Sequence, residues 1–209
     1  MEQGSPEWLA LRAGKVTASR VADVIARTKT GWGASRANYM AELIAERLTG
    51  QPAPSFSNAA MQWGTDKEPE ARDYYAFITG ATVEQIAFVH HPTVADSGAS
   101  PDGLVGDDGL VEIKCPNTAT HIDTLLGAVG PSKYMTQMQW QLACTGRKWC
   151  DFVSYDPRMP ESMQLFVTRI ERDDDVIAVL EKDVAEFLAE VAEKVAALTE
   201  RYEPQRVAA

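Results

Sequence analysis

The segments Ser100-Pro101-Asp102-Gly103 and Val111-Glu112-Ile113-Lys114-Cys115-Pro116 decide the fold that this sequence predicts. The second segment is short and apolar, and a proline ends it, so we expect a buried strand over residues 110–115. Side chains at positions i and i+2 of a strand point to the same face, so Glu112 and Lys114 point together. The proline and glycine around Asp102 are turn residues, which predicts a hairpin that brings the Asp102 carboxylate to the same place.

This arrangement predicts a metal-assisted hydrolytic site. Two converging carboxylates repel each other unless a divalent cation bridges them, and hard oxygen ligands suit Mg²⁺. A lysine beside such a cation can orient an attacking water and stabilise charge on a phosphate. The competing interpretation is an ordinary Glu–Lys pair on a surface strand. The apolar residues that flank Glu112 and Lys114 favour the site, because an unpaired charge on a buried strand is costly.

The rest of the pattern predicts one α/β domain over residues 1–209. We divide it into an N-terminal helical part (1–80), a sheet-containing catalytic core (81–171) and a long C-terminal helix (172–202). Within it we expect helices near residues 6–12, 17–25 (capped by Thr17), 35–50 (capped by Ser35), 57–80, 118–126, 132–144 and 173–202. We expect strands over residues 83–90, 149–155 and 163–170, a loop over 27–35 and a hairpin within 96–109. Pro69 either kinks the 57–80 helix or starts a new one. We expect the tryptophans at 8, 63, 140 and 149 to belong chiefly to the core.

The sequence resembles a known nuclease family. Asp102 with Glu112-Ile113-Lys114 resembles the PD-(D/E)xK nuclease signature, and the longer strings around them are similar to its lambda-exonuclease (YqaJ-type viral recombinase) branch. Further landmarks follow in the family's order: Trp8-Leu9-Ala10-Leu11-Arg12, Thr17-Ala18-Ser19, Trp63-Gly64-Thr65-Asp66-Lys67-Glu68, Tyr134-Met135-Thr136-Gln137-Met138-Gln139 and Tyr155-Asp156-Pro157-Arg158-Met159. The resemblance spans nearly the whole chain and implies a restriction-endonuclease-like core, a mixed central β-sheet flanked by helices.

The resemblance also implies roles for individual residues. Asp102, Glu112 and the Ile113 main-chain carbonyl would bind Mg²⁺, and Lys114 would position the nucleophilic water. Glu68 resembles the family's extra acidic residue, which helps to hold a second metal or its waters, and the resemblance allows Mn²⁺ in place of Mg²⁺. Gln137 would lie beside the catalytic lysine. The alternatives are that the Glu68 carboxylate is merely exposed on its helix and that the Gln137 amide merely faces solvent.

A second set of residues resembles the family's DNA-end contacts. Arg12 would grip a 5′-terminal phosphate and Ser19 would share it, which suits a planar guanidinium and a capped helix start. Without the resemblance, an ordinary surface arginine and an N-cap serine are equally good interpretations. Met61 stands where the family places an apolar wedge that splits terminal base pairs. The family can show a basic residue four positions before Trp63, where this chain has the uncharged Ala59.

These features predict an Mg²⁺-dependent 5′→3′ exonuclease that degrades one strand of duplex DNA from 5′-phosphorylated ends to mononucleotides. The resemblance further implies a homotrimeric ring around DNA and a single-strand annealing protein as recombination partner. The alternatives are a DNA endonuclease of restriction or repair type and a non-catalytic DNA-end-binding or protein-binding module. The presence of Asp102, Glu112 and Lys114 together argues against a decayed site.

Composition limits the other possibilities. The 209 residues carry 20 Lys and Arg against 30 Asp and Glu, a net charge of −10, which by itself argues against a nucleic-acid or membrane-surface protein. Residues 1–50, however, hold seven Lys and Arg against five Asp and Glu. We therefore expect DNA contact through a narrow basic surface plus metals. Cys115, Cys144 and Cys150 predict free buried thiols, and we expect a cytoplasmic protein without a signal peptide or a membrane span.

Overall fold

The computed structural model describes residues 3–54, 58–128 and 130–202. Its central sheet has five strands in the spatial order β10 (Leu165–Glu171), β9 (Trp149–Tyr155), β8 (Gly109–Lys114), β7 (Gly103–Val105) and β4 (Val83–Glu84). The β8–β9 pair is parallel, and the other neighbouring pairs are antiparallel. The sheet is therefore mixed, as the sequence predicts.

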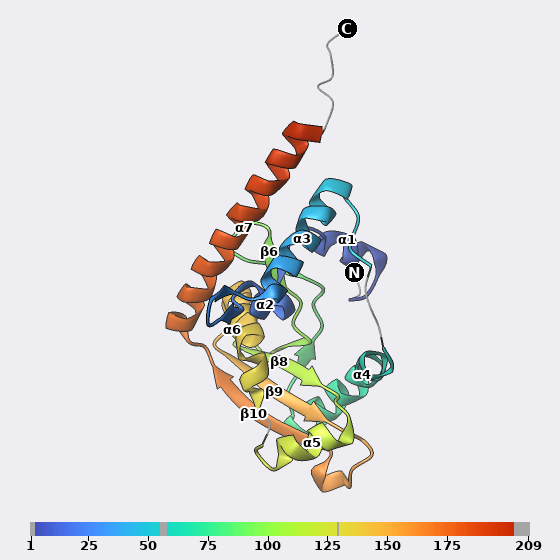
Figure 1. The fold of residues 1–209 in the computed structure, drawn as a ribbon. Coiled ribbons are helices and arrows are strands. Elements are labelled where there is room, and N and C mark those ends of the chain that lie inside the picture. The colour runs from blue at the N-terminus through green and yellow to red at the C-terminus, as the bar shows by residue number, and fades with distance from the viewer. Residues whose placement is uncertain (1–2, 55–57, 129, 203–209) are drawn as a thin grey trace.

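The helices lie before, between and after these strands (Figure 1). The α-helices are α1 (Pro6–Arg12), α2 (Val21–Val24), α3 (Ala34–Thr49), α4 (Ala59–Thr79), α5 (Thr118–Leu125), α6 (Met135–Thr145) and α7 (Asp174–Tyr202), and the 3₁₀ turns are η1 (Ala18–Arg20), η2 (Pro131–Tyr134) and η3 (Glu161–Met163). None of the helices in the described ranges is both long and apolar enough to cross a membrane.

Different helices cover the two faces of the central sheet. Val111 of β8 belongs to one apolar cluster with Tyr75 of α4, whereas its neighbour Leu110 belongs to another cluster with Leu142 of α6. Alternation along the strand then places Glu112 on the face that carries α6. The sheet is thus a layer between α4 and α6, and the polar pair of β8 faces α6.

A smaller sheet connects the N-terminal segment to the Asp102 turn. Its strands have the order β1 (Val16–Thr17), β6 (Ser97–Ala99) and β5 (Val89–His90), with β1 parallel to β6 and paired Val16↔Ser97. The segment after β1 carries Ser19, and the segment after β6 carries Asp102. This pairing therefore brings two predicted site segments together although they are far apart in the sequence.

The terminal helix packs against the N-terminal helices, as its apolar stripe predicts. The Phe187 ring of α7 stacks on Tyr39 of α3 with 5.8 Å between ring centroids, and Arg36 makes a two-bond ion pair with Glu190. The buried residues of α7 are Ile177, Leu180, Val184, Phe187, Leu188 and Val191. The stripe is less covered toward the end of the helix, where Leu198 is 38% exposed.

Several predicted boundaries are wrong for local reasons. Residues 27–35 are not simply a loop, because β2 (Arg27–Thr28) and β3 (Gly31–Trp32) form a hairpin. Gly33, not Ser35, occupies the N-cap of α3 and has no side chain to cap it. Thr17 occupies the N-cap position of η1 but makes no side-chain cap bond. The expected strand over 83–90 is split, since β4 and β5 join different sheets.

Pro69 neither ends α4 nor starts a new helix. The helix runs continuously over Ala59–Thr79, and the Asn58 side chain caps it by accepting from the Met61 main-chain N–H. Ser57, the predicted start, lies outside the described residues. Tyr75, beyond the proline, is 1% exposed. The helix therefore continues through the proline, and its second half packs against the sheet.

Two further expectations concern buried side chains. Cys115, Cys144 and Cys150 are free and buried, as predicted. The expectation that the four tryptophans belong chiefly to the core is confirmed for Trp140, which is fully buried. It is wrong for Trp8, because this side chain lines a cavity.

Candidate active site

Glu112 and Lys114 of β8 form the centre of the candidate site. Their predicted common orientation is confirmed, since Lys114 Nζ contacts Glu112 Oε1. Glu112 is fully buried, whereas the Lys114 side chain is 27% exposed and stands at the end of the strand. The Lys114 ammonium also lies 4.9 Å from the Tyr134 ring centroid. The lysine therefore contacts a buried carboxylate and is itself partly exposed.

Asp102 joins this pair from the turn between β6 and β7. Its Oδ2 accepts a hydrogen bond of 2.7 Å from the main-chain N–H of Ile113, the residue between Glu112 and Lys114. The following Gly103 lets β7 lie close to β4, because a Cβ there would lie 2.4 Å from Val83 Cγ1. The predicted convergence of the two carboxylate segments is thus present. The predicted hairpin around Asp102 is wrong, because β6 and β7 join different sheets and the hairpin is formed by β7 and β8.

Two glutamines of α6 hold the Glu112 carboxylate. Gln137 Nε2 donates to Glu112 Oε1, and Gln141 Nε2 donates to Glu112 Oε2, each at 2.6 Å. The structure places Gln137 on the same oxygen that Lys114 contacts. The resemblance did not indicate Gln141, although its i+4 spacing from Gln137 on one helix face is a signal that could have identified it.

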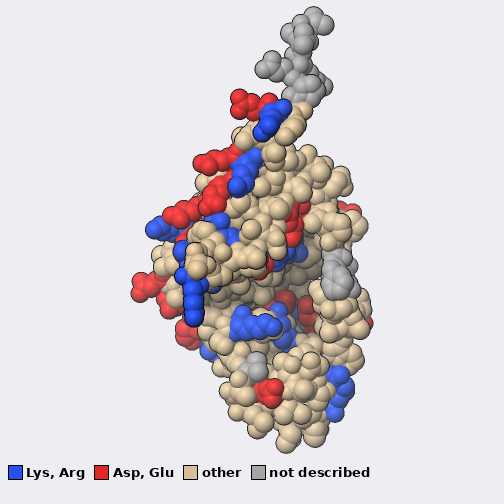
Figure 2. All heavy atoms as spheres, viewed as in Figure 1, with Lys and Arg blue, Asp and Glu red and all other residues tan. Residues whose placement is uncertain are grey.

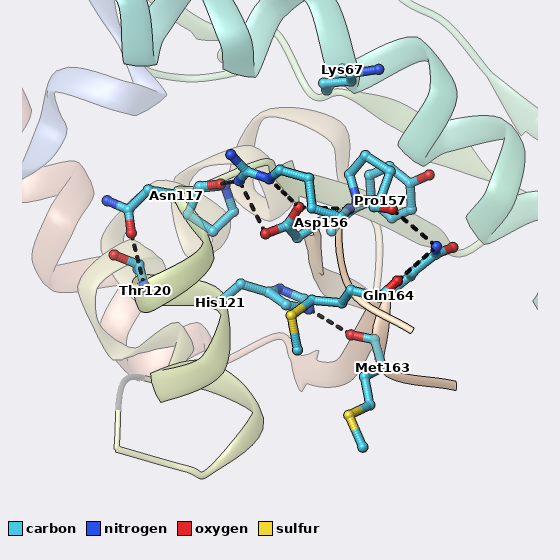
Figure 3. Close-up of polar contacts among 12 residues, drawn as sticks. Lys67, Asn117, Thr120, His121, Asp156, Pro157, Met163 and Gln164 are labelled. Atoms are coloured by element: carbon cyan, nitrogen blue, oxygen red, sulfur yellow. Dashed lines mark hydrogen bonds and ion pairs between the residues drawn. The ribbon is translucent and has the colours of Figure 1, made fainter. Parts of the chain in front are cut away.

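Figure 3 shows how the chain beyond Lys114 is fastened to the end of β9. The buried His121 of α5 lies 2.8 Å through Nδ1 from Ser154 Oγ and 2.8 Å through Nε2 from the Met163 carbonyl oxygen. Nearby, Arg158 donates to Asp156 and to the Pro116 carbonyl oxygen. These bonds fix the segments that follow both strands of the parallel pair.

Glu68 approaches the site from α4. Its Oε1 accepts from Arg72 on the next turn of the helix, and Arg72 Nε donates to the Asp102 carbonyl oxygen at 2.9 Å. The α4 helix is anchored by Glu70, which accepts from Tyr155 at 2.8 Å, and by Trp63, whose ring lies under the Arg158 guanidinium. Glu68 is thus connected to the Asp102 turn through Arg72.

The charges of the site are poorly compensated. Burial raises the pKa of Asp102 well above its usual range, and the charges of Glu112 and Glu68 raise it further. Burial also raises the pKa of Glu68. Burial lowers the pKa of Lys114, but the charges of Glu112 and Asp102 outweigh this effect and the net shift is upward. Three carboxylates therefore share the site with two cationic side chains, Lys114 and Arg72, and an added cation would offset the remaining negative charge.

The carboxylates suit a divalent cation that keeps part of its water shell. Within the described ranges, no three His, Cys, Asp or Glu side chains come close enough to form a complete metal cage. Mg²⁺ is usually held by one or two carboxylates together with waters and substrate phosphates. Asp102 and Glu112, with the strand main chain at Ile113 between them, are a donor set of that kind.

Arg12 and Ser19 lie on the same cavity as the acidic residues. This cavity of about 250 Å³ is lined by Gln3, Trp8, Arg12, Thr17, Ala18, Ser19, Ser100, Asp102, Glu112, Lys114 and Gln137. Figure 2 shows that this face of the molecule is hollowed between the part that carries α1–α3 and the part that carries α4 and α5. The cavity therefore brings Arg12 and Ser19 together with Asp102, Glu112, Lys114 and Gln137, whereas Glu68 is not among its described lining residues.

Arg12 has the features of an anion-binding group. Its Nε is buried and has no hydrogen-bond partner among the described residues, and burial lowers the pKa of the guanidinium. The guanidinium stacks on Trp8, with 3.7 Å between the Arg12 Cζ atom and the ring centroid. Trp8 in turn donates to Ser100 Oγ at 3.0 Å. Trp8 and Ser100 were not predicted as site residues, although Trp8 stands in the same landmark string as Arg12 and Ser100 lies two residues before Asp102.

Met61 lies beside the first cavity rather than in it. It is on the first turn of α4, is 53% exposed, and lines a second cavity of about 520 Å³. The two cavities share Arg12, Thr17 and Ser19 as a common wall. An exposed apolar side chain next to the Arg12 wall is compatible with the predicted wedge. Ala59 is the first residue of α4 and supplies no charge there.

The chain is similar to known proteins along most of its length. Residues 7–148 match the model of the YqaJ-like viral recombinase domain family. The crystal structure of the alkaline exonuclease LHK-Exo from Laribacter hongkongensis is 57% identical, with a TM-score of 0.87, and the match covers 94% of this chain and 97% of that chain. Its complex with dAMP gives the same values. None of the curated proteins matches the chain significantly.

A more distant structure supports the fold alone. The phage related exonuclease from Haemophilus somnus 129PT is 16% identical, with a TM-score of 0.70, and the match covers 88% of this chain and 95% of that chain. The mixed sheet flanked by helices is therefore the core of the PD-(D/E)xK fold, as expected. With a family match over residues 7–148 and a relative that is 57% identical, this chain belongs to the YqaJ-like viral recombinase family and is a nuclease of that family.

Proposed function

We propose that the protein is an Mg²⁺-dependent 5′→3′ exonuclease that degrades one strand of double-stranded DNA from 5′-phosphorylated ends. The observation that carries this proposal is the single cavity that Arg12 and Ser19 share with Asp102, Glu112 and Lys114. An anion-binding arginine and a hydrolytic acid–lysine set at one site suit a substrate with a terminal phosphate close to the bond that is cut. The likeness to an alkaline exonuclease supports the same reaction class.

The residues divide the chemistry among them. Asp102, Glu112 and the Ile113 carbonyl would hold Mg²⁺, or Mn²⁺ in its place, and Glu68 would help to hold a second ion, directly or through water. Such ions supply Lewis-acid stabilisation of the phosphodiester and of the leaving oxygen. Gln137 and Gln141 keep the Glu112 carboxylate in one orientation. Lys114 holds the attacking water in line with the phosphorus.

The direction of degradation follows from the anchored phosphate. Water attacks the phosphorus between the first and second nucleotides, the P–O3′ bond breaks, and the terminal nucleotide leaves with a 3′-hydroxyl. The shortened strand then carries a new 5′-phosphate, so every cycle regenerates the group that Arg12 and Ser19 bind. Mononucleotides are released, and a 3′ single-stranded overhang remains on the other strand.

Association with other chains is part of the same proposal. A ring-shaped homotrimer around the duplex would keep the enzyme on one DNA molecule, and a single-strand annealing protein would take over the 3′ overhang. Both expectations rest on the family. Sedimentation of the purified protein tests the trimer, and co-purification with an annealing protein on resected DNA tests the partner.

Strand-specific labelling tests the proposed reaction. Linear duplex DNA labelled at either the 5′ or the 3′ end of one strand is incubated with Mg²⁺, and covalently closed circular DNA is the control. We expect early release of labelled mononucleotide from the 5′ end only, faster with a 5′-phosphate than with a 5′-hydroxyl. Cutting of closed circles would indicate an endonuclease, and binding to DNA ends without degradation would indicate a non-catalytic module.

A further inference from the structure

Arg72 makes a direct polar link between the two sides of the proposed metal site. It follows Glu68 by one turn of α4, and its Nη2 donates to Glu68 Oε1. Its Nε donates to the Asp102 main-chain oxygen at 2.9 Å. Glu68 belongs to a helix and Asp102 to a connection between strands, so one guanidinium fixes the position of one relative to the other.

A third acceptor completes the contacts of Arg72. With the Gln85 side-chain amide oriented so that its oxygen faces Arg72, that oxygen accepts from both Nη1 and Nη2. A guanidinium offers its donors in one plane at fixed angles, and it can therefore serve a carboxylate, a carbonyl and an amide at once. A lysine would supply the charge from a single point and could not reproduce this geometry.

The burial of Arg72 separates its role from substrate binding. Arg72 is 8% exposed, whereas the Glu68 side chain is 30% exposed. Among the described residues, those that line the 250 Å³ cavity include Asp102 but not Arg72. Arg72 thus supports the acidic residues from behind and does not face the space where DNA would bind.

Repulsion makes this support necessary. The negative charges of Glu112 and Glu68 both act on Asp102, and the charge of Glu112 acts on Glu68. Lys114 is occupied by Glu112 at the other side of the group. Without the guanidinium, repulsion would drive the Glu68 carboxylate toward solvent and free the Asp102 turn to shift.

We propose that Arg72 is a positioning residue for the divalent-cation site, which holds the Glu68 carboxylate and the Asp102 turn in their binding arrangement. This inference rests on the proposed function, which makes Glu68 and Asp102 metal-binding residues. Arg72 acts through these two residues, so its loss weakens the affinity for the metal and leaves the affinity for DNA at saturating metal unchanged.

The direct test measures Mn²⁺ binding by calorimetry without DNA, in the full-length wild type and in Arg72→Gln and Arg72→Lys. Removing a residue that orients metal ligands typically weakens metal affinity by about 10–100-fold, which is the loss we expect for Arg72→Gln. Arg72→Lys keeps the charge without the planar geometry, so we expect an intermediate loss. If Arg72→Gln does not fold, Arg72→Lys decides the outcome.

Arg169→Gln is the matched control. Arg169 of β10 makes a two-bond ion pair with the buried Asp151, at 2.8 and 3.0 Å, and neither is among the described residues that line the 250 Å³ cavity. This variant also loses a guanidinium from a buried carboxylate, and we expect it to keep wild-type Mn²⁺ affinity. Thermal unfolding of all variants shows how far each substitution loosens the fold.

A double variant shows whether Arg72 acts through Glu68. In a Glu68→Gln background, we expect Arg72→Lys to weaken Mn²⁺ binding by a smaller factor than it does in the wild type, because the two residues act as one unit. The inference would be overturned if both Arg72 variants bound Mn²⁺ with an affinity within about twofold of the wild type.

DNA degradation, measured in parallel, separates this inference from the proposed function. If the wild type degrades DNA and the Arg72 variants keep its Mn²⁺ affinity, the role of Arg72 is contradicted but the proposed function is not. The opposite outcome is also informative. If the wild type binds Mn²⁺ but does not degrade linear DNA, the proposed function is contradicted. If the Arg72 variants then bind Mn²⁺ more weakly than the wild type, the role of Arg72 is still supported.

Discussion

The Arg12 guanidinium lies over the Trp8 ring, 3.7 Å from its centroid, and the same tryptophan donates to Ser100 Oγ at 3.0 Å. One indole therefore orients both an arginine and a serine on the wall of the cavity. The Ala87 carbonyl oxygen fixes the indole in turn, since it accepts from Trp8 Nε1 at 2.8 Å. The 5′-phosphate contact proposed for Arg12 thus depends on the pose that Trp8 imposes.

Arg12→Ala should narrow the preference for 5′-phosphorylated over 5′-hydroxyl ends. Hydrogen bonds to a charged group contribute about 1.5–3 kcal/mol, so we expect this preference to fall by roughly tenfold or more. Trp8→Phe keeps a ring under the guanidinium but loses the N–H, and we expect a smaller loss in the same direction. Degradation rates on paired 5′-phosphate and 5′-hydroxyl substrates measure the effect. A preference that survives Arg12→Ala would place the phosphate elsewhere.

Met61→Ala should slow the degradation of blunt duplex ends and spare ends that are already unpaired. The side chain is 53% exposed, so we expect a change in unfolding free energy within about 0.5 kcal/mol. The comparison uses a blunt duplex and a duplex with two mismatched terminal pairs. Phe77→Ala, an 81% exposed apolar residue on the same helix, is the control. Equal slowing on both substrates would argue against a wedge.

Gln141→Met should impair catalysis although Gln141 is fully buried and outside the cavity lining. It removes the 2.6 Å hydrogen bond to Glu112 Oε2, and we expect a loss of about 1–3 kcal/mol in unfolding free energy together with slower DNA degradation. Gln139→Met is the control, because the Gln139 side chain instead bonds Glu171 and Asp173 at the start of α7. That variant should lose stability but retain degradation below its melting temperature. Equal activity losses would remove the specific role of Gln141.

The burial of His91 predicts that the free energy of unfolding decreases in acid. Burial lowers its pKa, the nearby Arg172 lowers it further, and Glu181, 3.3 Å from Nε2, opposes the shift. The unfolded chain takes up a proton near the ordinary value of about 6.5 while the folded chain resists it, so the unfolding free energy falls as the pH drops from about 7 to 5.

His91→Asn tests this dependence. Its side-chain oxygen can replace Nδ1 as the acceptor of the Val94 N–H, which lies at 3.0 Å, but it cannot titrate. We expect a lower unfolding free energy overall and a shallower decline between pH 7 and 5 in urea denaturation. His90→Asn, a substitution at the exposed neighbour in β5, is the control. An unchanged acid slope in His91→Asn would assign the decline to other groups.

The sequence predicts best those features that depend on local periodicity. Strand β9 has the predicted bounds, and Glu112 and Lys114 face the same side because alternation along a strand is a local rule. The split of residues 83–90 between two sheets was not predictable, because β-branched and aromatic enrichment does not reveal which partner a strand joins.

The site was predictable where a motif carries it and not where packing creates it. Asp102, Glu112 and Lys114 follow from residue type and spacing, whereas Trp8, Ser100 and Gln141 reach the site only through β1–β6 pairing and the packing of α6 on the sheet. Such neighbours depend on contacts between distant segments, and a single sequence does not display these contacts.

The central claim is that the Asp102–Glu112–Lys114 group hydrolyses DNA, and single-turnover degradation of a 5′-labelled, 5′-phosphorylated duplex with Mg²⁺ tests it most directly. We expect Lys114→Ala and Asp102→Asn each to slow release of the first nucleotide by at least about 100-fold. Without divalent cation, Asp102→Asn should unfold at a higher temperature than the wild type, because the raised pKa of Asp102 marks its charge as unfavourable in the fold.

Lys148→Ala is the control for that measurement, because Lys148 is a surface lysine paired with Asp108 at 2.9 Å. It should keep the wild-type rate. If Lys114→Ala and Asp102→Asn fold and still release the first nucleotide at the wild-type rate, the account is contradicted. The hydrolytic site would then lie elsewhere on the molecule.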